Sequence, residues 1–133
     1  MMKIAYIMRG VPGSGKSTVA KILASEIGRI HSTDDLFIVD GEYRFDLERL
    51  PENHEHNFKM FCNSLNEGIP IVICDNTNTK RWEFERYVHA ATQADYFVAF
   101  VLLPHPEPEL ASQRSIHKVP VETIRQMITE WEN

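Results

Sequence analysis

The chain has 133 residues, enough for one domain of ordinary size, and its 43% hydrophobic content can fill a core, so wholesale disorder is excluded. Its 14 basic and 19 acidic side chains give a net charge of −5, so we expect no binding of nucleic acid through bulk charge, although a local basic groove stays open. No apolar run approaches the roughly 20 residues of a membrane span, and Cys62 and Cys74 stand alone, which fits a reducing compartment. We therefore expect a cytoplasmic protein that does not enter the membrane.

The N-terminal part of the chain predicts a strand, a glycine-rich turn and a helix. Residues Ile4–Met8 form a short apolar run typical of a buried strand, and residues 10–15 form the turn. The helix that follows should end at Gly28. Its apolar positions share one face: Val19, Ile22, Leu23 and Ile27.

The middle of the chain predicts a weak strand, a hairpin and a second helix. Arg29–Ser32 indicates the strand, and Phe37–Phe45 alternates around Asp40–Gly41 as a hairpin or an ordered loop does. The second helix should end at Gly68. Its apolar face carries Phe58, Phe61, Cys62 and Leu65.

The C-terminal half predicts two further buried strands and two further helices. The strands are Ile69–Cys74, which runs into Asp75, and Tyr96–Leu103. Between them, a third helix has an apolar face made by Phe84, Tyr87, Val88 and Ala91. After the second strand, prolines at 104, 106 and 108 should break regular structure, and Pro120 suits the first turn of a last helix.

Strands that alternate with helices predict an α/β fold of three layers, with a small parallel sheet of about four strands flanked by helices, in one domain over residues 1–133. In such sheets, ligands bind at the carboxyl ends of the strands. The polar residues with candidate chemistry fall there, because the glycine turn follows the first strand, Asp34 follows the second and Asp75 follows the third.

The glycine turn matches the phosphate-binding pattern G-x-x-x-x-G-K-[ST] at every fixed position. Glycines let backbone N–H groups curl around phosphate oxygens, and the N-terminus of the following helix adds partial positive charge. Lys16 can reach the β- and γ-phosphates of ATP, and the Ser17 hydroxyl can ligate Mg²⁺. The residues that we assign to nucleotide binding are Gly10, Pro12, Gly13, Ser14, Gly15, Lys16, Ser17 and Thr18.

The acidic residues at the strand ends supply the other groups that a P-loop enzyme needs. Asp75 closes an apolar run as a Walker-B aspartate does and can hold a metal-bound water, or it merely turns the chain. One of Asp34 and Asp35 can accept a proton from a hydroxyl group, or the pair is a helix cap with a solvated neighbour.

The ordered set of motifs resembles the P-loop kinases of the polynucleotide 5′-hydroxyl kinase type. The matching stretches are Arg9–Thr18, Ser32–Asp35 and Asp75–Asn78, and the tail Arg114–Met127 is similar to the lid and last helix of the phage-type enzyme. The middle of the chain, with Gly41–Phe45, resembles a subgroup of short P-loop proteins and a domain of a large ubiquitin-ligase-binding protein.

The resemblance implies a role for each matching residue. Lys16 and Ser17 would bind phosphate and Mg²⁺, Asp75 would support the metal side, and Asp34 would be the general base. Arg114 would be the lid arginine that closes over ATP and neutralises charge during transfer.

The chain departs from that family at three positions where the family carries arginine. They hold Thr33, Phe37 and Leu110, so the cationic clamp for a DNA or RNA acceptor is weakened.

Three hypotheses follow. The first is an ATP- and Mg²⁺-dependent kinase that phosphorylates a hydroxyl acceptor, either a polynucleotide 5′-hydroxyl or a small metabolite. The second is a nucleotide-dependent binding module or slow ATPase without an acceptor, and a third, weaker one is a hydrolase domain of a larger assembly.

Six other side chains have simpler interpretations. His54 and His56 point apart on a helix, so we expect no metal site there. We expect Trp82 and Trp131 to be packing residues. Tyr43 and Asn57 either line an acceptor pocket or pack and cover helix surface.

Overall fold

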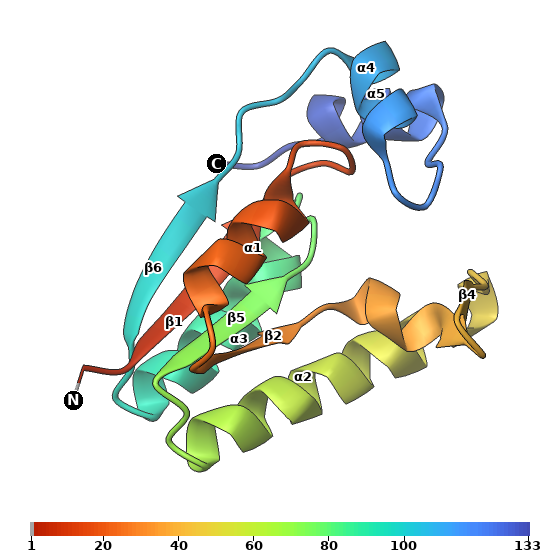
Figure 1. The fold of residues 1–133 in the computed structure, drawn as a ribbon. Helices are drawn as coiled ribbons and strands as arrows, with labels where there is room; N and C mark the ends of the chain where they lie inside the picture. The colour runs from red at the N-terminus through yellow and green to blue at the C-terminus, as the bar shows by residue number, and fades with distance from the viewer. Residues whose placement is uncertain (1) are drawn as a thin grey trace.

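The computed structural model describes residues 2–133. The elements are β1 (Ile4–Arg9), α1 (Lys16–Ala24), β2 (Gly28–His31), η1 (Thr33–Phe37), β3 (Ile38–Val39), β4 (Glu42–Tyr43), η2 (Leu47–Arg49), α2 (Leu50–Asn66), β5 (Ile71–Asp75), α3 (Arg81–Gln93), β6 (Phe97–Leu102), α4 (Pro108–Arg114) and α5 (Val121–Thr129). Four strands form a parallel sheet in the order β2–β5–β1–β6, and β3 pairs with β4 in a small antiparallel hairpin (Figure 1). The predicted α/β fold is confirmed.

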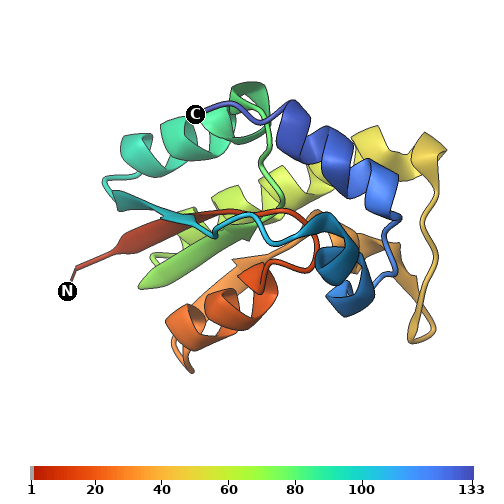
Figure 2. The same ribbon diagram turned by 90° about the horizontal axis from the view of Figure 1, so that it is seen from above.

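Alternation along the strands divides the core between the two faces of the sheet. Ala5 and Ile7 of β1 point toward α2 and α3, where they join a cluster with Phe61 and Tyr87. Met8 points to the other face and packs with residues of α1. Figure 2 shows the result: α1 covers one face of the sheet, and α2 and α3 cover the other.

The first helix differs from its predicted form. Ile22 and Ile27 are 72% and 56% exposed, and the helix ends at Ala24. The small buried side chains Ala20 and Ala24 let the helix lie close to the sheet instead. Gly28 does not end the helix but begins β2, where a Cβ atom would lie 2.8 Å from the Cα atom of Ala24.

The proline-rich segment contains a helix that the sequence did not predict. Pro108 occupies the first turn of α4, a position where a missing N–H costs nothing. Helices α4 and α5 pack on each other through Ala111 and Ile124 and enclose Val11 of the glycine turn. This pair of helices therefore lies over the carboxyl end of β1.

None of the helices within residues 2–133 combines the length and the apolar character that a membrane crossing requires.

Candidate active site

The glycine turn joins the end of β1 to the start of α1 and has the backbone conformation of a phosphate cradle. Gly13 and Gly15 have φ angles of 82° and 93°, which favour glycine. At Gly13 a Cβ atom would lie only 2.1 Å from the carbonyl oxygen of Ala111, so α4 touches the turn directly. The Oγ atom of Ser14 is buried and has no hydrogen-bond partner within residues 2–133. The turn therefore fits a ligand that accepts hydrogen bonds, as phosphate oxygens do.

Lys16, Ser17 and Asp75 meet behind this turn. The Nζ atom of Lys16 lies 3.0 Å from Oδ1 of Asp75, and the Ser17 hydroxyl donates to Oδ2 of Asp75, also at 3.0 Å. Lys16 and Asp75 are 9% and 4% exposed, so the ion pair is buried. Parallel pairing of β1 with β5 places Asp75 beside Met8, two residues before the turn begins.

The oxygen atoms of Ser17 and Asp75 fit Mg²⁺, which prefers hard oxygen ligands and takes only one or two carboxylates from a protein. In the part of the chain that the structure describes, no cluster of three or more His, Cys, Asp or Glu side chains is arranged to hold a metal ion. A metal held here would need oxygen atoms from phosphate and water to complete its shell, as P-loop sites do.

Asp34 and Asp35 lie on η1, directly after β2, and face different neighbours. Burial, together with the adjacent Asp34 carboxylate, raises the pKa of the Tyr43 phenol to about 12. Burial raises the pKa of Asp35, and the negative charges of Asp75 and Asp34 raise it further. Asp34 thus lies beside Tyr43, and Asp35 lies within the field of Asp75.

Thr33 connects this acidic pair to β5 and α2. Its backbone N–H donates to Oδ1 of Asn76 over 3.0 Å, and its hydroxyl lies 3.1 Å from Nδ1 of His54. Burial and the nearby Arg86 guanidinium lower the pKa of His54, against the opposite effect of Asp34. His54 is therefore a neutral imidazole at pH 7.

Asn57 is a buried residue of α2. It is 3% exposed and donates to the Tyr87 hydroxyl over 3.0 Å, so it packs inside the protein instead of lining an acceptor pocket. Tyr43 does reach the site. Its ring stacks on His117, in the loop between α4 and α5, with ring centroids 3.7 Å apart and an interplanar angle of 17°. The hairpin and the loop between α4 and α5 thus meet, a contact that no pattern in the sequence indicated.

Arg114 is the last residue of α4 and is exposed. It lies three residues after Ala111 and therefore on the same side of the helix as the contact with Gly13. Within residues 2–133, no salt bridge holds its side chain. The structure therefore brings Lys16, Ser17 and Asp75 together, places Asp34 at the end of the neighbouring strand, and leaves Arg114 on the helix that contacts the glycine turn.

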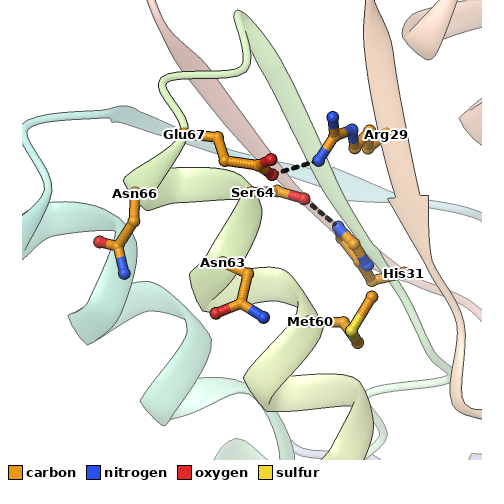
Figure 3. A pocket seen from close by; sticks show the side chains of 7 residues that line it. All are labelled: Arg29, His31, Met60, Asn63, Ser64, Asn66 and Glu67. Carbon is orange, nitrogen blue, oxygen red and sulfur yellow. Dashed lines mark hydrogen bonds and ion pairs between the residues drawn. The ribbon is translucent and has the colours of Figure 1, made fainter.

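The surface of residues 2–133 has hollows beside β2 and beside β5. The larger, about 710 Å³, lies between β2 and α2, away from the glycine turn (Figure 3). His31 and Ser64 line it, and the Nε2 atom of His31 lies 2.8 Å from the Oγ atom of Ser64. Burial, together with the charge of Arg29, lowers the pKa of His31 to about 4. The smaller hollow, about 470 Å³, is lined by Asn76 and His54, the two side chains that contact Thr33.

Trp82 lines the smaller hollow and is 69% exposed, so its predicted packing role is wrong. It lies in the first turn of α3, where its side chain points away from the core. Trp131 does pack, as predicted, beside the cluster of Val11, Ala111 and Ile124.

Solved structures of other proteins share this fold. One chain of the Pnkp1/Rnl/Hen1 RNA repair complex matches 97% of this chain over 44% of its own length, with a TM-score of 0.71 and 25% identity. A gluconokinase from Sinorhizobium meliloti matches 97% of this chain over 75% of its own, with a TM-score of 0.61 and 21% identity. Kti12 from Chaetomium thermophilum, solved with ADP-AlF3, matches 97% of this chain over 80% of its own, with a TM-score of 0.68 and 14% identity.

Curated sequences and a family model also match. Human NEDD4-binding protein 2 is 35% identical over 137 residues, which cover 97% of this chain and 8% of that protein. Human YLP motif-containing protein 1 is 28% identical over 156 residues, which cover 98% of this chain and 7% of that protein. The chain thus spans less than a tenth of the length of either relative. The model of the AAA domain family matches residues 6–130. This chain therefore belongs to the AAA domain family, with the P-loop kinase-like fold that supports nucleotide binding.

Proposed function

We propose that this protein is an ATP-dependent kinase that transfers the γ-phosphoryl group of ATP to a hydroxyl acceptor. The observation that carries the proposal is the buried cluster of Lys16, Ser17 and Asp75 behind the glycine turn. Asp34 stands at the end of β2, next to β5 in the sheet. A phosphate donor and an acceptor hydroxyl can therefore be held at adjacent strand ends.

Each side chain has a defined task in this proposal. Backbone N–H groups of the glycine turn bind the phosphates, and Lys16 exchanges its contact with Asp75 for the β- and γ-phosphate oxygens. Ser17 and Asp75 would hold Mg²⁺, which supplies neutralisation of the charge that develops on the phosphates. Arg114 neutralises further charge when the lid closes.

The transfer step exchanges one phosphorus–oxygen bond for another. The oxygen of the acceptor hydroxyl forms a bond to the terminal phosphorus, while the bond from that phosphorus to the bridging oxygen breaks and ADP leaves. The hydroxyl proton moves to the Asp34 carboxylate. Its neighbour Tyr43 has a raised pKa, so the phenol stays protonated at pH 7 and leaves Asp34 as the base.

The test follows label from γ-labelled ATP in the presence of Mg²⁺, with a 5′-hydroxyl oligonucleotide, a nucleoside or gluconate as acceptor. The wild-type protein should label one of them, and Lys16→Ala should abolish the signal. Asp34→Asn should still bind ATP but lower kcat by about 10²- to 10⁴-fold, whereas Asp35→Asn is the matched control with a smaller effect. Transfer at the wild-type rate by Asp34→Asn would refute the assignment of the base.

A nucleotide-dependent binding module, or a slow ATPase without an acceptor, is the second candidate. The observation that favours it is that Thr33 and Phe37 are 3% and 2% exposed, so two positions that hold arginine in the resembling kinases are filled by buried, uncharged side chains. It predicts release of free phosphate with no stimulation by any hydroxyl compound.

We also infer a cytoplasmic location. Cys62 and Cys74 are both free thiols, and Cys74 is buried in the core. Their unpaired state supports residence in a reducing compartment.

A further inference from the structure

The smaller hollow adjoins the candidate transfer site through two short links. Asn76 directly follows Asp75 in the chain, and its Oδ1 atom accepts the N–H of Thr33, the residue before Asp34. His54 lines the same hollow and lies 3.1 Å from the Thr33 hydroxyl. Its volume of about 470 Å³ falls in the usual range for small-molecule sites. The Asp34 carboxylate acts to raise the pKa of His54, so the candidate base lies near the wall that His54 forms.

Another part of the wall of this hollow is aromatic and apolar. Trp82 offers an indole ring that is 69% exposed, although large aromatic side chains are usually buried. The Arg86 guanidinium beside it lies 4.4 Å from the centre of the Phe58 ring, which holds its plane in place. Leu50 and Pro51 add apolar surface from the start of α2. These surfaces fit a planar ring.

The residues that line the hollow include no unpaired cationic side chain that could bind a phosphate. Its single cation is Arg86, whose Nη1 atom lies 2.7 Å from Glu55, while Nη2 donates to the carbonyl of His54 over 3.1 Å. Glu83 adds a second negative charge, and it is held by the N–H of Lys80. With His54 neutral, the side chains that line the hollow carry a net charge of −1, which repels a phosphate ester.

We propose that this hollow binds an uncharged nucleoside, whose base stacks on Trp82 and whose 5′-hydroxyl reaches toward Asp34. The proposal rests on the proposed function, because it names the acceptor of that transfer. The polar side chains in the wall are mostly engaged with protein partners, so the base is held by stacking and not read by its edges. We therefore expect little preference among bases.

The experiment measures binding and needs no turnover. Trp131→Phe leaves Trp82 as the only tryptophan of the chain, so fluorescence reports on the hollow. With the donor site filled by a non-hydrolysable ATP analogue, cytidine and adenosine should quench this fluorescence with dissociation constants within about fivefold of each other. Addition of a 3′-phosphate to either nucleoside should weaken binding, because the hollow is negatively charged.

Variants test the stacking in the protein with both tryptophans, by calorimetry. Trp82→Ala should weaken nucleoside binding by roughly 5- to 150-fold, the range for loss of one base–aromatic stack, and Trp82→Phe should retain most of the affinity. Phe97→Ala removes a ring of similar exposure, 63%, from the far edge strand β6 and should change nothing.

Three results would overturn the inference: no binding of either nucleoside, equal affinity in Trp82→Ala, or tighter binding of the 3′-phosphate. A short 5′-hydroxyl strand that binds tenfold tighter than the free nucleoside would also overturn it, because the strand carries phosphates. The proposed function fails separately, when wild-type protein transfers label to no acceptor although nucleosides still bind at Trp82.

Discussion

Replacement of Asp75 by asparagine isolates the buried charge pair of the site. Lys16 is 9% exposed, and the only acidic oxygen bonded to its ammonium group within residues 2–133 belongs to Asp75, at 3.0 Å. Removal of one partner from a buried pair costs about 3–5 kcal/mol, because the remaining charge stays out of water. The side-chain amide oxygen can still accept the Ser17 hydroxyl. We therefore expect Asp75→Asn to lower the free energy of unfolding by about 3 kcal/mol, the lower end of that range.

Urea denaturation without nucleotide, followed by circular dichroism, measures this loss. Lys16→Met and the double variant Lys16→Met/Asp75→Asn complete a double-mutant cycle, in which the double variant should lose at least about 1 kcal/mol less than the two single losses added together. Glu67→Gln is the control, since it breaks the exposed ion pair with Arg29 and should cost less than about 1 kcal/mol. Additivity within about 0.5 kcal/mol would refute the reasoning that the pair is coupled.

Three further predictions concern the turn, the lid and the hollow beside β2. Gly13→Ala should weaken ATP binding at least about tenfold in calorimetry, because the new Cβ atom meets Ala111 and the φ angle of residue 13 is positive. Gly41→Ala is the control: its φ angle is also 82°, but a Cβ atom there meets nothing within 4 Å, so ATP affinity should be unchanged. His117→Ala removes the stack on Tyr43 and should speed tryptic cleavage of the loop between α4 and α5; an unchanged rate would show that the stack does not hold the loop. His31 has a folded pKa of about 4, below its ordinary 6.5, so stability is fully present above pH 6.5 and falls by about 2–3 kcal/mol as the pH drops toward 4. A His31→Gln variant with the same slope in pH-dependent urea denaturation would contradict this last prediction.

The strands and the glycine turn were predictable because their signals are local. Buried parallel strands read as continuous apolar runs, and the runs at Ile4–Met8 and Ile69–Cys74 correspond to β1 and β5. The turn needs glycine at positive φ, which a sequence displays directly. The hairpin around Asp40–Gly41 was visible for the same reason, since both residues have positive φ.

Other features escaped because they depend on contacts between distant parts of the chain. The three prolines predicted an interruption where the short helix α4 forms, and this helix packs on Ile124 and on the glycine turn. The apolar pattern of α1 suggested that Ile22 is buried, but the close approach of the helix to the sheet favours alanine on the inner face. Trp82 is predicted to be a packing residue, whereas its position in the first turn of α3 leaves it exposed.

Local patterns in the sequence suffice to predict a phosphate loop on a parallel α/β scaffold, because glycine placement and apolar periodicity act over a few residues. Which side chains share the site depends on how distant segments of the chain pack together. The order β2–β5–β1–β6 sets Asp75 against Lys16 and Ser17 and brings Thr33 to Asn76. The packing of α4 and α5 brings His117 onto Tyr43. These contacts join residues up to 74 positions apart, and chain connectivity leaves such pairings open until the core packs.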